Sequence, residues 1–142
     1  MDDLLDSQYV IFKLADDKCA LKINDIFETI RMQKITAVPN SRAFLEGIIN
    51  LRGKVVPVVN IHKRFGIKNY SATKSTRIIV VESRDEIIGM IVDEVSQVLR
   101  FKEIQQAPDM LGELDSSYFL GIGIMEEGIA GILKIDKILY HE

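Results

Sequence analysis

The feature that most constrains the fold of this chain is an internal repeat. Residues 9–31 match residues 78–100 position by position, and their acidic turns coincide, with Asp16 against Asp85. The match resumes further along, where "KVVPVVNIHKRF" parallels "EGIAGILKIDKIL". Repetition of turns and glycines together with apolar positions predicts two similar modules. The seam between them falls in the polar stretch of residues 68–76.

The repeated segments have the pattern of strands. Apolar, β-branched runs such as "YVIFKLA", "KVVPVVNI", "TRIIVVES" and "GIAGILKI" are separated by turn-prone residues. Each half is interpreted as a hairpin, a strand leading into a turn, a long loop and a second hairpin. Modules of ~70 residues are near the lower limit for independent stability, so we expect both to pack into one cooperative domain over residues 1–142.

The fold class predicted is all-β with short helices. Small sheets of short strands favour barrels, because closure removes exposed strand edges. Pro57 lies inside an otherwise good strand and has no amide proton to donate, so we expect it at a sheet edge or a bulge.

Composition argues against several classes of function. The net charge is −3, Trp is absent and aromatic residues make up 7% of the chain, which disfavours nucleic-acid binding. No apolar run reaches the ~20 residues of a membrane-spanning helix, so direct membrane insertion is not expected. Cys19 is the only cysteine, which excludes an internal disulfide and favours a cytoplasmic location.

Residue types that carry catalysis are scattered. His62 and His141 are far apart, so a zinc site is not expected, and Cys19 is expected to be buried in a strand. "GIG" at residues 121–123 is interpreted as a bend between strands rather than a phosphate loop. The pair at residues 93–94 is interpreted as a solvated turn or helix start. These observations favour a binding module without cofactor or enzymatic activity.

Three segments resemble the chemotaxis coupling protein family, CheW. They are "LEGIINLRGKVVPVVNIHKRFG", "TRIIVVE" followed by "IIGMIVDEVSQVLRF", and "PDMLGELDSSYFLGIGIMEEGIAGILKIDKIL". The match covers residues 9–140 in order.

The resemblance implies a fold, a function and partners. The fold is two small five-stranded, SH3-like β-barrels packed together. The function is that of a non-catalytic adaptor, which links the cytoplasmic helical hairpin of a chemoreceptor to the regulatory domain of the chemotaxis histidine kinase, CheA. The expected location is the cytoplasm, with recruitment to membrane receptor arrays, and we expect a monomer outside the array.

The resemblance also implies two binding surfaces. The receptor surface comprises Ile26, Glu28, Gly47, Arg52, Gly89, Val95 and Val98. Within it, Glu28 and Arg52 match an ion pair of the family, and the spacing of Val95 and Val98 allows one face of a helical turn. Gly53 is expected at positive φ in the turn that follows Arg52.

The kinase surface is expected in two segments. Residues 38–44 and the loop near Lys54 form the first, with Val38 and Phe44 as its apolar members. Residues 104–110 form the second, which comprises Gln105, Asp109 and Met110.

This chain departs from the family pattern at three positions. Asn60 and His62 stand where an acidic residue and an arginine are common, and Lys134 stands where an acidic or neutral residue is common. His62 is interpreted as a solvated surface side chain.

Other functions remain open on sequence alone. The same adaptor fold serves non-flagellar chemosensory circuits. A small barrel that binds a ligand or nucleic acid is an alternative of another class, and it would require a basic face with stacking aromatic side chains.

Overall fold

The computed structural model describes residues 2–39, 44–68, 70–111 and 114–140. The elements follow the chain in the order α1 (Asp2–Asp6), β1 (Tyr9–Leu14), β2 (Asp17–Lys22), η1 (Ile23–Asp25), β3 (Ile26–Arg31), β4 (Leu45–Leu51), β5 (Lys54–Asn60), α2 (Ile61–Arg64), β6 (Arg77–Ser83), β7 (Glu86–Val92), β8 (Glu94–Leu99), β9 (Glu103–Gln105), β10 (Met110–Leu111), β11 (Leu114–Asp115), η2 (Ser116–Tyr118), β12 (Phe119–Met125), β13 (Gly128–Leu133) and α3 (Ile135–Tyr140). The predicted all-β class with short helices is confirmed.

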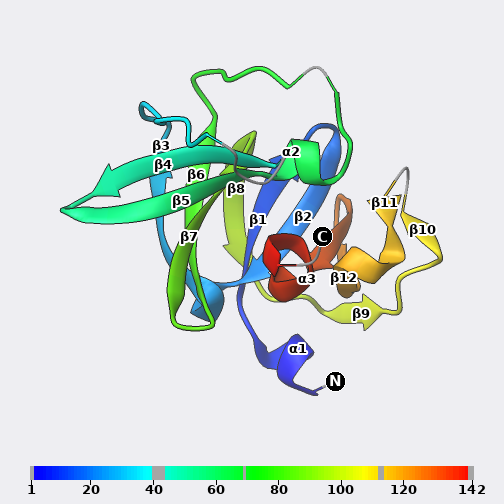
Figure 1. Cartoon of the computed structure of the whole chain (residues 1–142). Coiled ribbons are helices and arrows are strands. Elements are labelled where there is room, and N and C mark those ends of the chain that lie inside the picture. Colours follow the sequence, from blue (N-terminus) through cyan, green and yellow to red (C-terminus); the bar gives the residue numbers. More distant parts are fainter. Residues whose placement is uncertain (1, 40–43, 69, 112–113, 141–142) are drawn as a thin grey trace.

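The strands form two main sheets that share one topology (Figure 1). The five-stranded sheet has the order β3-β6-β7-β5-β4, and the six-stranded sheet has the order β8-β1-β2-β13-β12-β9. Five positions of each sheet are filled by repeat counterparts of the other sheet's strands, and β9 is an additional strand at one edge of the six-stranded sheet. Both sheets contain one parallel pair, β5 with β7 and β13 with β2.

The two sheets exchange strands between the sequence repeats. After β2 the chain passes through η1 into the five-stranded sheet, and after β7 it returns at Asp93 to the six-stranded sheet. The hairpin β1-β2 therefore pairs with strands of the second repeat, and the hairpin β6-β7 pairs with strands of the first. The seam of the repeats in the sequence is not the boundary between the sheets.

Both sheets close on themselves. Thr36, just beyond β3, exchanges two backbone hydrogen bonds of 2.9 Å with Ile48 of β4, which joins the two ends of the five-stranded sheet. In the six-stranded sheet, the chain leaves β8, enters β9 and pairs with β12. In each sheet, the chain that follows one outer strand, β3 or β8, reaches the strand at the opposite end, β4 or β12. This closure makes each sheet a barrel.

The core explains why the strands have continuous apolar runs instead of strict alternation. On β1, Tyr9 and Ile11 point into a cluster inside one barrel, whereas Phe12 and Leu14 point into a cluster shared by both barrels. Side chains of β6 alternate in the same way. Ile78 points into the cluster inside the other barrel, and the next residue, Ile79, points into the shared cluster. Both faces of these strands are buried, one inside a barrel and the other where the barrels pack together, so both kinds of packing contribute to hydrophobic stabilisation.

Pro57 lies in the interior strand β5 and not at a sheet edge. Its neighbour across β4 is Ile48, whose backbone hydrogen bonds go to Thr36. The nitrogen of Pro57 therefore faces β7, and pairing with β7 begins only at Val58. The missing amide proton therefore removes no hydrogen bond to β4, which is why proline is tolerated here.

The glycines of residues 121–123 do not form a bend between strands, as the sequence interpretation held. They lie within β12. A Cβ at Gly123 would come within 2.4 Å of the Phe101 ring, so glycine is needed for close approach of this ring to the strand.

His62 was expected on the surface, and this prediction is wrong. The side chain is 2% exposed and stacks against Tyr70 at 4.4 Å between ring centroids. Part of the reason is local. Asn60 ends β5 and caps α2, accepting hydrogen bonds from the amides of His62 at 2.9 Å and Lys63 at 3.3 Å. The helix that begins there turns the imidazole inward.

The part of the chain described here contains no helix long and apolar enough to cross a membrane. Within the same residues, no three His, Cys, Asp or Glu side chains are grouped closely enough to hold a metal ion. Cys19 is buried, as expected, and burial raises the pKa of its thiol, so it is held in the unreactive protonated form.

Candidate functional site

The turn between β4 and β5 is the most constrained part of the candidate receptor surface. Leu51 pairs with Lys54, which leaves Arg52 and Gly53 as a two-residue loop. Their φ angles are 51° and 87°, as a hairpin turn with two left-handed residues requires. Asn50 Oδ1 accepts a hydrogen bond from the Gly53 amide at 2.9 Å. The expected positive φ of Gly53 is confirmed, whereas that of Arg52 was not foreseen.

Arg52 forms a two-pronged ion pair with Glu28 of β3. Its Nη1 lies 3.3 Å from Oε1, and its Nη2 bonds to Oε2. The hydrogen bond that Arg52 donates to Glu28, and then the charge of Glu28, raise the pKa of Arg52. Because β3 and β4 are the outer strands of their sheet, the pair joins the same two strands as the Thr36–Ile48 bridge. It fixes the direction in which the turn projects.

A shallow apolar hollow lies beside this ion pair. It has a volume of about 180 Å³ and is lined by Phe27, Leu51, Arg52, Lys54, Val56 and Ile87. Phe27 is 50% exposed on the outer face of β3, and Val55 is 67% exposed on β5. Sequence reasoning missed both residues. The signal was present, since an aromatic residue on the solvent side of an alternating strand indicates contact with something outside the fold.

The other apolar members of the receptor surface divide between core and surface. Ile26 and Val95 are half-buried against the cluster shared by both barrels. Val98 is 51% exposed on β8. The expectation that Val95 and Val98 share a helical turn is wrong, because they belong to a strand that pairs with β1, with a bulge between them. Only Val98 presents most of its side chain to solvent.

The two glycines assigned to the receptor surface are buried. At Gly47, where φ is 153°, a Cβ would lie 2.1 Å from the Thr36 carbonyl oxygen. At Gly89 a Cβ would lie 2.8 Å from Ile78. Both positions keep backbones close inside one barrel, so an influence on binding would act through the shape of that barrel.

The first candidate kinase segment contains exposed and buried residues. Lys54 is exposed at the β4-β5 turn, and Val38 is 36% exposed. Phe44 is 9% exposed and packs in the shared cluster, with the Arg64 guanidinium 5.3 Å from its ring centre. Residues 40–43 of this segment lie outside the described residues.

The second candidate kinase segment begins in β9 and ends in β10. Gln105 is exposed and donates to Glu103 Oε2 at 2.7 Å. Asp109 is exposed, and its carbonyl accepts from the Ser116 amide at 3.2 Å. Met110 pairs with Asp115 through the backbone, and the position of its side chain lies outside what the structure describes.

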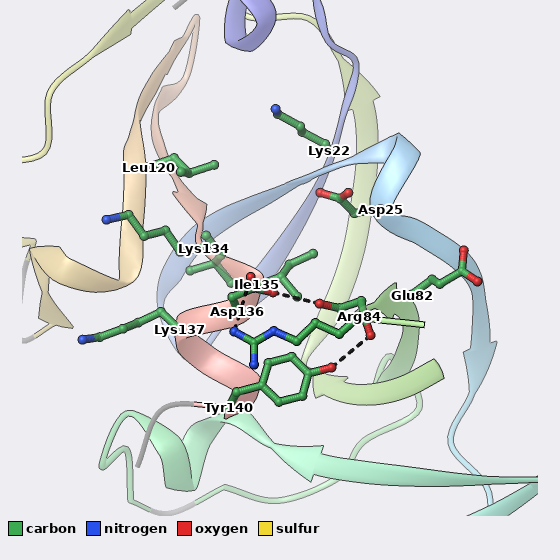
Figure 2. Close-up of a pocket in the computed structure, with 12 residues that line it drawn as sticks. Lys22, Asp25, Glu82, Arg84, Leu120, Lys134, Ile135, Asp136, Lys137 and Tyr140 are labelled. Atoms are coloured by element: carbon green, nitrogen blue, oxygen red, sulfur yellow. Dashed lines mark hydrogen bonds and ion pairs between the residues drawn. The ribbon is translucent and has the colours of Figure 1, made fainter. Parts of the chain in front are cut away.

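A second hollow of the described residues was not foreseen from the sequence. It is a cleft of about 640 Å³ between η1, the β6-β7 turn and α3 (Figure 2). Its walls come from segments more than a hundred residues apart, so no local sequence motif predicts the cleft. It shares no residue with the receptor and kinase surfaces described above.

Comparison with known proteins identifies relatives over almost the whole chain. A family model described as a CheW-like domain matches residues 8–142. The chemotaxis protein CheW of Thermotoga maritima is 34% identical over 138 residues, which cover 97% of this chain and 91% of that protein. The chemotaxis protein CheW of Helicobacter pylori is 31% identical over 134 residues, covering 93% and 81% respectively.

A solved structure agrees with the fold. The crystal structure of the scaffolding protein TtCheW from Thermoanaerobacter tengcongensis superposes with a TM-score of 0.85 at 36% identity. The match covers 93% of this chain and 86% of the other.

Proposed function

This chain belongs to the CheW family, and from that premise we propose that it is a non-catalytic scaffold that couples chemoreceptors to the chemotaxis histidine kinase. The receptor partner is the cytoplasmic helical hairpin, and the kinase partner is the regulatory domain of CheA. The observation that carries the proposal is the Glu28–Arg52 pair on a rigid turn beside an apolar hollow.

The receptor surface suits a helical hairpin in its chemistry. A helix that docks on a protein presents an apolar stripe with polar flanks. Phe27 and Ile87 supply apolar wall, and Arg52 supplies a cation at its edge. The fixed turn lowers the ordering cost of binding, because its backbone and the Arg52 side chain are already held in place.

The proposed kinase contacts are those with accessible side chains. Val38 and Lys54 form one group, and Gln105 and Asp109 form the other. Phe44 packs in the core beside the first group, and Met110 stays a proposed member of the second group. Each contact is expected to be small, so strength would come from repetition of contacts in an array at the membrane. In this proposal the protein acts in the cytoplasm, is recruited to receptor arrays and is monomeric outside them.

A calorimetric titration tests the proposal. The chain is titrated with a receptor-tip fragment and, separately, with a kinase regulatory domain, both from the same genome. The expected result is saturable binding to each, with Arg52→Ala weakening the receptor titration and leaving the kinase titration unchanged. Lys34→Ala, an exposed cation outside the hollow, serves as the matched control. Binding to neither partner would contradict the coupling function.

A further inference from the structure

The internal repeat makes two places in the fold equivalent. One is filled by a side-chain carboxylate, and the other contains a cleft. Each lies where the chain crosses between barrels, next to a hairpin turn and a short helix. In the first, here called the sealed junction, Asp93 inserts its carboxylate between the β1-β2 turn and α2. Its Oδ2 accepts from the Ala15 amide at 2.6 Å and lies 2.8 Å from His62 Nε2.

The second place, here called the open junction, has the corresponding parts without that carboxylate. Arg84, with φ 51°, stands where Ala15, with φ 58°, stands in the first. Asp136 is the second residue of α3, as His62 is of α2. The repeat position of Asp93 is filled by Asn24, which is exposed.

The open junction is held by contacts that leave a cleft. Ser83 Oγ donates to Asp136 Oδ1 at 2.8 Å, and Arg84 lies 3.7 Å from Asp136 Oδ2 and 4.2 Å from the Tyr140 ring centre. Tyr140 donates to Glu86 Oε2 at 3.0 Å, which fixes the ring against the turn. These contacts occupy the charges of Arg84 and Asp136. The remaining space is the cleft of about 640 Å³ (Figure 2).

Two lysines lie beside an exposed apolar side chain of this cleft. Lys134, after the end of β13, and Lys137 of α3 lie on the side of Leu120, which is 45% exposed, and Lys22 of β2 lies between Leu120 and Asp25 (Figure 2). The Glu82 carboxylate points away on the opposite side (Figure 2). Asp25 lies near Lys22, and burial raises the pKa of its carboxyl. The lining carries four cations against three carboxylates in a chain of net charge −3, and the cations around the apolar Leu120 are Lys134 and Lys137, with Lys22 nearby.

We propose that the cleft binds an acidic, amphipathic segment of a protein partner. An apolar side chain of the segment packs on Leu120, and its carboxylates approach Lys22, Lys134 and Lys137. Charge complementarity selects an acidic partner, and exposed Leu120 selects a segment with apolar side chains over a small inorganic anion. This surface is separate from those proposed for receptor and kinase, and it does not depend on them.

A nuclear magnetic resonance titration tests this proposal on the full chain. The probe is a capped hexapeptide, Glu-Leu-Glu-Glu-Leu-Glu, added at low salt to the isotope-labelled protein. The expected result is saturable shifts in amides that line the cleft, lost when each Glu of the peptide is replaced by Gln. The double variant Lys134→Glu/Lys137→Glu should weaken binding about tenfold, since two attractions become repulsions.

A second double variant controls for overall charge. Lys13→Glu/Lys34→Glu changes the net charge equally at exposed positions outside the cleft. It should leave the affinity close to that of the unmodified chain, and dispersed spectra confirm that both variants fold. Equal weakening by the two double variants would overturn the proposal, because it would indicate general charge attraction. Absence of saturable shifts at millimolar peptide, or shifts centred on Phe27 and Arg52, would also overturn it.

Discussion

His62 Nε2 lies 2.8 Å from Asp93 Oδ2, which links the helix after β5 to the point where the chain crosses between barrels. The same carboxylate oxygen accepts from the Ala15 amide at 2.6 Å, so Asp93 joins three segments that are distant in sequence. On the other side of the ring, Nδ1 lies 3.2 Å from Asn60 Oδ1. Asn60 and His62, which depart from the family pattern, thus contact each other and are linked through the His62 ring to Asp93.

Asp93→Ala should destabilise the fold. The change leaves the buried His62 ring without its acceptor, and such an unsatisfied buried group costs about 1–3 kcal/mol. Water can replace the acceptor of the exposed Ala15 amide, so urea unfolding should show a loss of about 1–3 kcal/mol. Glu94→Ala, at the exposed neighbouring position, should change the stability by less than about 0.5 kcal/mol. Equal effects of the two substitutions would show that the Asp93 contacts contribute nothing.

Glu46 should make the protein sensitive to acid. Its Oε1 lies 2.8 Å from Lys63 Nζ and 3.1 Å from Asn60 Nδ2, and the hydrogen bond from Lys63 is the main cause of its lowered pKa. A carboxyl with a lowered pKa in the folded state contributes stability that is full above its ordinary pKa of about 4.3 and is lost as pH falls through the lowered value.

The measurement is the urea midpoint of the chain and of Glu46→Gln between neutral pH and the acid limit of folding. The difference between the two proteins should be constant at neutral pH and should shrink as pH falls below about 4.3. A difference that stays constant over the whole range would mean that the Glu46 contacts do not depend on its charge.

Gly123→Ala should destabilise the six-stranded barrel by overpacking. The new Cβ would lie 2.4 Å from the Phe101 ring, and extra methyl groups in a filled core cost about 1–3 kcal/mol. Phe101→Leu in the same chain removes ring atoms from the clash, so the cost of Gly123→Ala should be smaller there. Additive losses in the double variant would contradict this account of the "GIG" segment.

Val98→Glu should weaken receptor binding without unfolding the protein. Val98 is 51% exposed, so the free energy of unfolding should change by less than about 0.5 kcal/mol. A charge on this surface would have to be buried against the apolar stripe of the receptor helix, which is unfavourable. Ile129→Glu, at a position 45% exposed on β13, is the control. Normal binding of Val98→Glu to a receptor-tip fragment would remove Val98 from the receptor surface.

Much of the fold could be predicted from local sequence. The runs that include Tyr9, Ile78 and Ile129 became strands, and the family resemblance predicted that Glu28 and Arg52 would pair. Exchange of strands between the repeats could not be predicted from the repeat itself. Two modules that pack side by side and two that exchange hairpins present the same apolar positions, and the difference lies in where the chain goes after β2 and β7.

The failures have a common physical cause. His62 is polar and follows a strand, so a surface position was the simplest expectation. Its burial depends on Asp93, which is 31 positions away. The need for glycine at position 123 comes from the Phe101 ring. The cleft forms where Arg84 and Asp136, which are distant in sequence, approach each other. Contacts between distant segments decide these positions, and a local pattern does not encode them.

Arg52→Gly gives the most direct test of the coupling account. Glycine adopts the positive φ at this position without strain, so the free energy of unfolding should stay within about 1 kcal/mol, whereas the guanidinium that pairs with Glu28 is removed. The measurement is kinase activity with receptor-containing membranes, CheA and this chain combined. We expect the unmodified chain to activate the kinase only when all three are present, and Arg52→Gly to lose most of that activation. Full activation by folded Arg52→Gly would contradict the claim that the Glu28–Arg52 turn organises the receptor surface.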